Sequence, residues 1–223
     1  ALGNQTHIDG PLPGSIDRVT ITYDGFDNRT SLDDPDKGLR EYWYNELGEE
    51  LCALDQRGFA VQQSYDGLGR VVSRNDVTGV SDTQTCSGAI QSTATWRYGH
   101  DIGDSASFGQ LVLETDEFVE RSYFYDPMGR IDSVQHRLIQ RGGVIFTQST
   151  TYDEFGRVFQ RFDGSPNLGG VQYLYNDRGY QTQIQEAGDA SRIYQTIHSL
   201  DAFGNATYET QGNGVVTRRL YDE

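Results

Sequence analysis

The sequence predicts an all-β protein, made of tandem β-hairpins that join into one long, curved antiparallel sheet. Three observations support this. A seven-residue unit recurs along the chain, apolar and polar residues alternate in front of it, and clusters of Gly, Pro, Asn and Asp separate the alternating segments. Alternation with a period of two residues is typical of strands, and turn clusters between strands indicate hairpins. No window shows a sustained helical period, so we expect negligible helix.

The recurring unit has the form Tyr-Asp-x-x-Gly-Arg followed by a β-branched residue. Three copies match it at every defining position: Tyr65–Val71, Tyr125–Ile131 and Tyr152–Val158. Looser copies begin at Tyr23, Tyr44, Tyr175 and Leu200. The Asp side chain can accept a hydrogen bond from the backbone two residues on, and the Gly suits a turn that needs positive φ. Each unit therefore predicts a strand, a tight turn and a second strand.

We expect this unit to have a structural role. The residues assigned to the repeat turns are Tyr65, Asp66, Gly69, Arg70, Tyr125, Asp126, Gly129, Arg130, Tyr152, Asp153, Gly156, Arg157, Tyr175, Gly179, Asp201 and Gly204. Positive φ is expected at the five glycines of this set. Arg70, Arg130 and Arg157 are expected to stack on, or pair with, a Tyr or Asp of a neighbouring unit. No catalytic, cofactor-binding or metal-binding residue is assigned.

The N-terminal part of the chain reads as regular hairpins. Residues 2–22 complete an interrupted unit, cross a loop at 9–14 and enter the alternating strand 19–23. Residues 23–64 hold two units of equal length. Within them, Leu54–Phe59 is interpreted as a turn at the opposite end of the same hairpins.

Residues 65–124 are the least regular part of the chain. Tyr98–His100 is interpreted there as a degenerate copy, with loop insertions at 81–92 and 101–108. Residues 125–223 return to regular hairpins. Further turns are expected at Asp33–Gly38, Arg141–Gly143, Asp163–Asn167, Ala187–Asp189 and Gly212–Gly214.

This pattern resembles the RHS/YD-repeat family, and the resemblance covers essentially the full chain. In that family the hairpins join into one sheet that spirals into a hollow shell. Its members include bacterial polymorphic toxins, the cocoon-forming components of insecticidal toxin complexes, and the teneurins. The resemblance implies that this chain is a wall segment of a shell, which encapsulates or displays a polypeptide in a secreted or cell-surface protein.

Two other functions remain open at the level of sequence. The chain could be an extracellular adhesive or filament-forming repeat protein that binds glycans or neighbouring copies. It could also contain an autoprocessing or hydrolytic element, although we assign no enzyme activity. The partners that we expect are adjacent repeats or other copies, with an enclosed polypeptide and glycans as further candidates.

Both ends of the sequence lie within a unit. Ala1–Thr6 resembles Ala202–Thr207 position by position, and Tyr221–Glu223 starts a unit that the sequence does not complete. We therefore expect residues 1–223 to be a single repeat array within a longer protein. Expressed alone, such an array would expose unpaired sheet edges and self-associate.

The composition argues against several classes of partner. A formal net charge of -15 and a pI near 4.5 disfavour nucleic acids and anionic membrane surfaces. No apolar run approaches the roughly 20 residues that a membrane helix needs, so we expect no membrane insertion. A hydrophobic content of 35% is low for a compact globule and suits a sheet with much wetted surface.

The sequence holds two cysteines, Cys52 and Cys86. A disulfide bond between them would suit an exported protein. Sequence alone supplies no geometry for a bond, and two separate thiols are the simpler expectation.

Two stretches resemble known functional motifs. Asp126–Gly129 resembles an Asp-Pro-x-Gly self-cleavage motif of toxin members of the family, but Arg130 follows where that motif has Leu. We interpret it as a repeat turn with Pro in its first corner. The acidic turn around Asp33, Asp34 and Asp36 could attract Ca²⁺, yet its spacing does not match a helix-loop-helix calcium loop, so we expect a solvated turn.

The remaining candidates are scattered side chains. His7, His100, His136 and His198 occur singly, without the spacing of a zinc site. Trp43, Trp96 and the repeated tyrosines could stack on sugars. We expect them instead to form cross-strand ladders, in which each pair contributes roughly 0.2–1 kcal/mol.

Overall fold

The computed structural model describes residues 3–10, 18–99, 107–164 and 169–221. Its 18 strands belong to one antiparallel sheet. Within the described ranges no residue is α-helical, and η2 is a single 3₁₀ turn, Ile139–Arg141. The all-β fold and the near absence of helix are therefore confirmed.

The chain divides into two units, which are described separately. Unit 1 comprises residues 1–98 and 113–119, and unit 2 comprises residues 99–112 and 120–223. The first strands are β1 (His7–Asp9), β2 (Arg18–Tyr23), β3 (Arg29–Asp34), β4 (Gly38–Tyr44), β5 (Glu50–Asp55), β6 (Phe59–Tyr65), β7 (Val71–Asp82), β8 (Ser87–Tyr98) and β9 (Leu111–Thr115). The others are β10 (Val119–Tyr125), β11 (Ile131–Leu138), β12 (Val144–Tyr152), β13 (Val158–Phe162), β14 (Val171–Tyr175), β15 (Gln181–Glu186), β16 (Asp189–Leu200), β17 (Ala206–Gln211) and β18 (Val216–Arg218).

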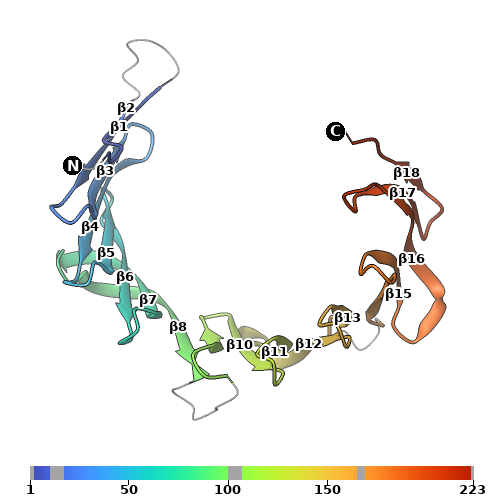
Figure 1. The fold of residues 1–223 in the computed structure, drawn as a ribbon. Coiled ribbons are helices and arrows are strands. Elements are labelled where there is room, and N and C mark those ends of the chain that lie inside the picture. The colour runs from blue at the N-terminus through green and yellow to red at the C-terminus, as the bar shows by residue number, and fades with distance from the viewer. Residues whose placement is uncertain (1–2, 11–17, 100–106, 165–168, 222–223) are drawn as a thin grey trace. The chain divides into compact units, whose positions relative to one another are not determined.

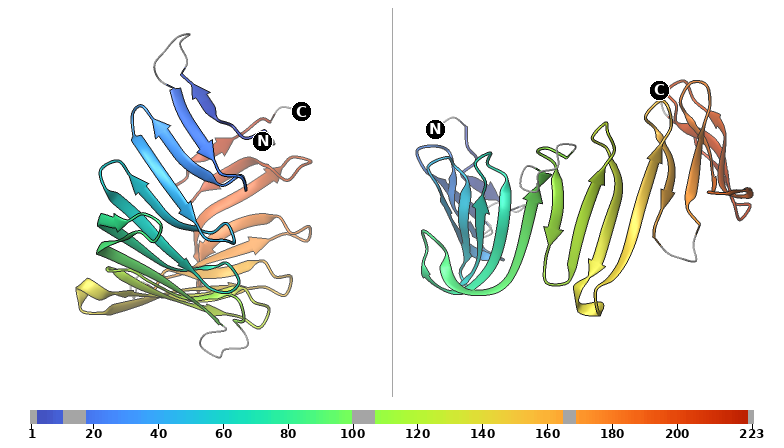
Figure 2. Two further views of the ribbon diagram at one scale, coloured as in Figure 1. Left: turned by 90° about the vertical axis from the view of Figure 1, so that its left-hand side faces the viewer. Right: turned by 90° about the horizontal axis from the view of Figure 1, so that it is seen from below.

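Within each unit the strands pair in the order of the sequence. In unit 1, each strand from β1 to β7 pairs with the next one, and all these pairs are antiparallel. In unit 2, β11 to β18 follow the same rule. Figure 1 shows this succession of hairpins, and Figure 2 shows neighbouring hairpins side by side within each unit. The tandem hairpins predicted from the sequence thus pair in sequence order inside both units.

Six repeats enter their turns through the same irregularity. The first and seventh residues of a copy pair with each other, as in Tyr23 with Arg29, Tyr44 with Glu50, Tyr65 with Val71, Tyr152 with Val158, Tyr175 with Gln181 and Leu200 with Ala206. In each case the register shifts by one residue just before this pair. Such bulges increase the local twist of a hairpin.

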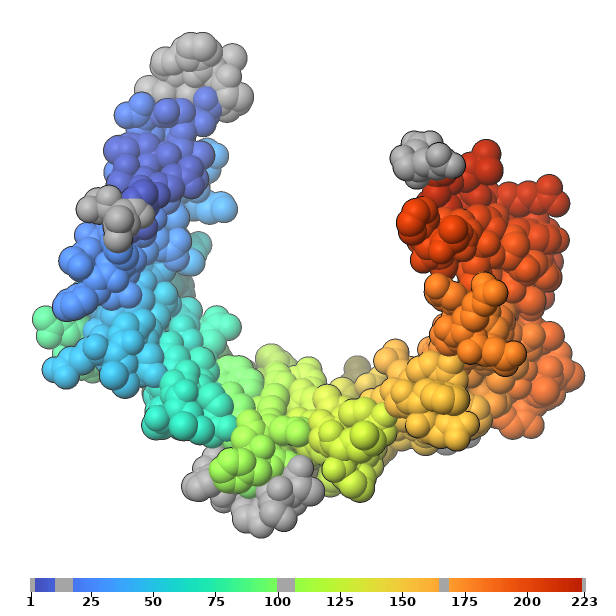
Figure 3. All heavy atoms as spheres, in the orientation of Figure 1, coloured from blue at the N-terminus to red at the C-terminus, as the bar shows by residue number. Residues whose placement is uncertain are grey.

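Few side chains are fully buried, because most of the sheet is a single layer. In Figure 3, segments of successive colour lie against each other within each unit, so each hairpin packs mainly on its neighbours in sequence. The buried apolar residues in the described ranges are Ile21, Tyr42, Cys52, Ala53, Ala60, Val77, Cys86 and Val112. The burial of a sheet like this is spread over many half-covered side chains.

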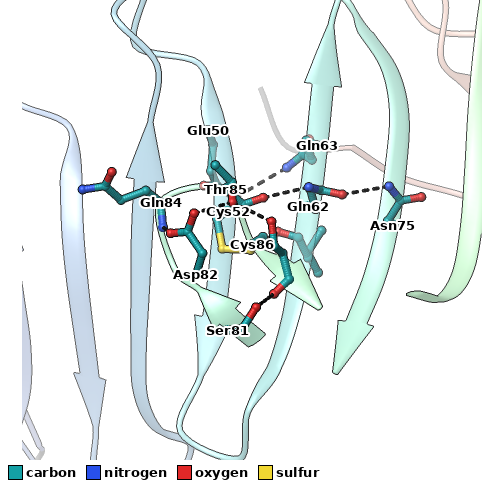
Figure 4. The surroundings of a disulfide bond; sticks show 12 residues. Glu50, Cys52, Gln62, Gln63, Asn75, Ser81, Asp82, Gln84, Thr85 and Cys86 are labelled. Carbon is teal, nitrogen blue, oxygen red and sulfur yellow. Dashed lines mark hydrogen bonds between the residues drawn. A yellow bond between two sulfur atoms is a disulfide. The ribbon is translucent and has the colours of Figure 1, made fainter. Parts of the chain in front are cut away.

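Unit 1 contains one compact cluster, where the tip of the β7–β8 hairpin crosses β6 to reach β5. Cys86 at this tip and Cys52 in β5 are both fully buried and form a disulfide bond, with their Cα atoms 5.4 Å apart. Ala60 and Val77 complete the buried cluster. The Gln62 amide donates to the Thr85 carbonyl at 2.7 Å, which holds the tip against β6 (Figure 4).

Two expectations about this region were wrong. Cys52 and Cys86 are not separate thiols, because the long β7–β8 hairpin folds back far enough to bring their Cα atoms within bonding range. Residues 81–92 are not a loop insertion, since β7 runs to Asp82 and β8 begins at Ser87. The extra residues lengthen the two strands, and this extra length supplies the fold-back.

The disulfide bond should stabilise unit 1 by restricting its unfolded chain. We expect Cys52→Ser together with Cys86→Ser to lower the free energy of unfolding by about 2–4 kcal/mol. Urea unfolding of the two proteins, followed by circular dichroism, measures the difference. The wild type should lose similar stability when reduced, and a reductant should leave the variant unchanged. Equal stability of the two proteins would contradict the role assigned to the bond.

Candidate functional site

In most repeats an Asp or Asn at the second position organises the turn through backbone hydrogen bonds. In the copy that begins at Tyr125, one Asp126 carboxylate oxygen accepts from the backbone N–H groups of Met128 and Arg130, both at 2.9 Å. The Gly129 N–H donates to the Asp126 carbonyl at 2.9 Å. The same two side-chain contacts recur at Asp66, Asp153 and Asp201. The carboxylate therefore acts as the acceptor around which the turn closes.

The glycines at the fifth position have the expected conformation. Their φ values are 75° at Gly69, 77° at Gly129, 80° at Gly156, 85° at Gly179 and 87° at Gly204, which confirms the prediction. In the first copy Asp27 takes this place with a φ of 66°. Asp is one of the few other residues that tolerate such angles.

The Arg of each close copy bridges two repeats. Arg130 Nε and Nη2 donate to the outer carboxylate oxygen of Asp126 at 2.8 and 2.6 Å. Its guanidinium carbon lies 4.0 Å from the centre of the Tyr152 ring, in the next repeat. Arg70 and Arg157 do the same with Asp66 and Tyr98, and with Asp153 and Tyr175. Each arginine thus stacks on the Tyr of the next repeat, as expected from the sequence. Its ion pair is with the Asp of its own repeat.

The Tyr hydroxyl supplies a second contact between the same repeats. Tyr152 donates to the carbonyl of Ile131, the residue that follows Arg130, at 2.9 Å. Its ring and its hydroxyl therefore contact adjacent residues of the preceding repeat. Eight tyrosines donate in this way to the seventh residue of the preceding copy: Tyr23, Tyr44, Tyr65, Tyr98, Tyr125, Tyr152, Tyr175 and Tyr221.

Three copies without Arg keep a side-chain bond between the second and sixth residues. Asn28 donates to Asp24 at 3.0 Å, and Asn205 donates to Asp201 at 2.9 Å. In the copy that begins at Tyr44 the roles are reversed, because Asn45 donates to Glu49. This bond therefore survives a change of both residue types. Leu200 has no hydroxyl, so the series of tyrosine contacts is interrupted there.

One copy was only half recognised in the sequence. Gly99 N–H donates to the Gln110 carbonyl at 2.9 Å, the bond that Asp126 makes to Arg130. Gly109 has a φ of 77°, and the Leu111 carbonyl accepts from Tyr125. Ser107–Leu111 therefore completes the copy that Tyr98 begins, and the assignment of 107 and 108 to a loop insertion was wrong. His100 and residues 101–106 lie outside the described ranges.

The sequence contained a signal for this copy. Phe108-Gly109-Gln110-Leu111 has the glycine and the apolar seventh residue of the unit. It was missed because an insertion separates it from Tyr98, and because no Asp precedes it at the usual distance.

Hydrogen bonding lowers the pKa of the turn carboxylates. For Asp66 the main cause is the hydrogen bond from the Arg70 side chain, and for Asp126 it is the backbone N–H of Arg130, with burial opposing both. Burial raises the pKa of the Tyr65, Tyr125 and Tyr175 hydroxyls. The carboxylates therefore stay charged at neutral pH and the phenols stay neutral, which suits the contacts that each of them makes.

Other residues weighed as sites have ordinary structural surroundings. Asp34 accepts from the backbone N–H groups of Asp36 and Lys37 in its own turn. In the part of the chain that is described, no group of three or more His, Cys, Asp or Glu side chains could hold a metal ion. Pro127 lies in a turn with the same hydrogen bonds as the other copies.

Two of the histidines and one tryptophan pack within the sheet. His136 stacks on Phe146 with ring centres 4.8 Å apart, and His198 stacks on Tyr208 at 4.5 Å. Trp43 packs against the disulfide cluster. The two histidines thus form cross-strand pairs, and the ladder expected for the tryptophans and repeated tyrosines stays a prediction.

Comparison with known proteins identifies the fold. No protein-family model matches the sequence, and no curated protein matches it. The structure matches that of the Photorhabdus luminescens Tc holotoxin pore with a TccC3 mutation, with a TM-score of 0.72, 17% identity and coverage of 92% of this chain and 10% of that chain. The TcdB2–TccC3 crystal structure without the hypervariable C-terminal region matches with the same values.

Over the matched residues this chain shares its fold with these Tc toxin structures. The matches confirm the predicted resemblance at the level of fold, since 17% identity supports no more than that. The chain spans about a tenth of the length of the chains that it matches. In the described residues, no helix is long and apolar enough to cross a membrane.

The contacts of Arg130 should contribute measurably to stability. Arg130→Met removes the ion pair with Asp126 and the stacking on Tyr152, and we expect a loss of about 1–3 kcal/mol in the free energy of unfolding. Arg141→Met is the matched control, because Arg141 is exposed at the other end of β11. It should change the stability by less than about 0.5 kcal/mol. Similar losses in both variants, measured by urea unfolding, would rule out a special role for Arg130.

The lowered carboxylate pKa values predict a loss of stability in acid. A carboxyl whose pKa is lower in the folded state stabilises the protein above its unfolded pKa of about 4, and this contribution disappears as the pH falls through the folded pKa. Asp126→Asn should keep the turn hydrogen bonds, as Asn45 does, and make the unfolding free energy less dependent on pH between about 5 and 3. Asp177→Asn, at an exposed position of the Tyr175 turn, is the control. A slope that is equally steep in Asp126→Asn and the wild type would contradict this assignment.

Proposed function

We propose that residues 1–223 form a stretch of wall in a β-shell that encapsulates or displays a polypeptide, such as a toxin or effector. The observation that carries the proposal is the repeated Tyr and Arg contact between successive hairpins. This contact occurs in a chain whose fold matches the Tc toxin structures over 92% of its length.

The contact favours a wall because it joins each repeat to the one before it and the one after it, so that further repeats can be added. Except at the Leu200 copy, each repeat uses its Tyr to bind the preceding copy, and most use their Arg or a backbone carbonyl to bind the following one, as Tyr152 and Arg157 show. Nearest-neighbour contacts of this kind let a sheet extend without a central core. The scarcity of fully buried side chains agrees with an extended layer and not with a globule.

The disulfide bond supports an exported location. Structural disulfide bonds persist in oxidising compartments and are rare in the cytosol. The Cys52–Cys86 bond, with both sulfurs fully buried, fits a secreted or cell-surface protein.

The proposal includes no enzymatic activity. The best-placed carboxylates, Asp66, Asp126 and Asp153, are each occupied by two backbone N–H groups and an arginine. Their lowered pKa values make them poor proton donors. These groups are suited to closing turns.

Limited proteolysis of the natural protein that contains this sequence tests the proposal. If the sheet is part of a closed wall, an enclosed polypeptide should resist an added protease, while the same polypeptide expressed alone should be cleaved quickly. Arg130→Glu places a second carboxylate beside Asp126 and should weaken the wall, so that cleavage of the enclosed polypeptide becomes faster.

The control is Arg141→Glu, which changes the same charge at an exposed position and should leave the protection unchanged. Cleavage of every segment at the rate of its free form would contradict encapsulation. Specific retention on a glycan array by such an unprotected protein would then favour the adhesive alternative.

A further inference from the structure

One arginine of unit 1 lacks the acid partner that its counterparts have. In the close copies the sixth residue pairs with the Asp at the second position, as in Arg70, Arg130 and Arg157. In the first copy Asn28 is the sixth residue and bonds to Asp24 at 3.0 Å, while the arginine follows as the seventh residue, Arg29. Among the described residues, the Arg29 side chain forms no hydrogen bond and no ion pair.

The fold nevertheless holds Arg29 in place. Its guanidinium carbon lies 4.2 Å from the centre of the Tyr42 ring, and Tyr42 is buried. The Nε atom of Arg29 is buried as well, and it has no hydrogen-bond partner. Removing part of a cation from water is costly when no opposite charge is in contact with it. A negatively charged ligand that reached this guanidinium would offset that cost.

Glu50 does not replace the missing acid. Burial raises the pKa of its carboxyl, and Arg29 and Arg40 oppose this shift through their charges. Within the described ranges Glu50 forms no ion pair with either arginine, and its carboxylate accepts only from Gln63, at 3.5 Å. The charge of Arg29 is therefore not neutralised by direct contact with this side chain.

Arg29 lines a cavity of about 690 Å³ on one face of β3, β4 and β5. These strands lie side by side, and the cross-strand pairs of Leu32 with Arg40 and of Arg40 with Asp55 belong to the lining (Figure 2). Besides Arg29, the charged residues of the lining are Asp34, Asp36, Lys37, Arg40, Asp55 and Arg57. A cavity of this size accommodates a ligand much larger than a simple ion.

The charges of this lining favour a single negative charge. Four cationic and three acidic side chains face the cavity. Two of the acids, Asp34 and Asp55, already accept hydrogen bonds within their own turns. Arg29, Lys37 and Arg40 form no ion pair with any residue that the structure describes. The chain as a whole has a net charge of -15, but salt at physiological strength screens exposed charges beyond about 8 Å, so the nearby cations dominate.

We propose that this cavity binds a peptide segment through a single carboxylate, the side chain of a Glu or Asp. A guanidinium presents parallel N–H donors that match the two oxygens of a carboxylate. Leu32 and Leu39 in the lining offer apolar contact to the residues beside it, and Gln56 offers an amide. A phosphate group carries about -1.5 to -2 charges and would be repelled more strongly by the three acids. The inference does not depend on whether the sheet encloses a polypeptide.

An NMR titration of the isotope-labelled 223-residue chain tests the proposal. The probe is the peptide Leu-Glu-Leu with both ends capped, so that the Glu side chain is its one charge. It should shift the Nε–H signal of Arg29 and the backbone signals of Leu39 and Gln56, and the shifts should saturate. The capped peptide Leu-Gln-Leu should cause no such shifts at the same concentrations. Inorganic phosphate and capped Glu alone should both bind more weakly than Leu-Glu-Leu.

Three variants locate the binding site. Arg29→Gln should raise the dissociation constant of Leu-Glu-Leu about tenfold or more, because the paired donors are lost. Arg40→Gln keeps Arg29 and its stacking on Tyr42, and should raise the constant about threefold. The matched control is Arg141→Gln, which removes the same charge at an exposed position of unit 2 and should stay within about twofold of the wild type. Circular dichroism confirms that each variant is folded.

Several results would overturn the proposal. They are the absence of saturable shifts with Leu-Glu-Leu, equal binding of Leu-Glu-Leu and Leu-Gln-Leu, and an unchanged dissociation constant in folded Arg29→Gln or Arg40→Gln. Tighter binding of phosphate would show that the site selects a different anion. Equal binding of capped Glu and the peptide would show that the cavity takes a small carboxylate and not a peptide segment.

Discussion

The structure depends on the contact between the arginine of one repeat and the tyrosine of the next. Arg130 is held in place by Asp126, and that pairing orients its guanidinium over the Tyr152 ring, 4.0 Å away. The Asp that closes the turn therefore also positions the group that joins the next hairpin. Turn formation and the coupling between repeats are thus parts of one arrangement, and a sheet with few buried side chains can remain ordered.

The disulfide cluster stabilises the sheet in a different way. Most of the sheet is stabilised by contacts between neighbours in sequence, whereas Cys52 and Cys86 join β5 to a hairpin tip across an intervening strand. The stretch 65–124 departs most from the regular pattern, and the cross-link holds the tip of a hairpin in that stretch, at Cys86. A covalent bond there compensates for local irregularity that the repeat contacts do not cover.

Much of this fold could be predicted from the sequence, because the residues that determine each hairpin lie close together in the chain and recur in every copy. The Asp and Gly of each turn imply the hairpins, and the short connections imply that each hairpin pairs with the next. The stacking of Arg70, Arg130 and Arg157 was also expected. The Cys52–Cys86 bond was not, since it depends on how far a long hairpin bends. The copy completed by Gly109 was missed because an insertion divides it, and the unpaired charge of Arg29 became visible only once its contacts were known.

A double-mutant cycle between Arg130 and Tyr152 tests the central claim most directly. Arg130→Met, Tyr152→Leu and the double variant are compared by urea unfolding. If the two residues couple neighbouring repeats, the double variant should lose less stability than the two single losses combined, by about 0.5–2 kcal/mol. The same cycle between Arg130 and Tyr175, one repeat further on, should be additive within about 0.5 kcal/mol. Additive losses for Arg130 and Tyr152 would contradict the account.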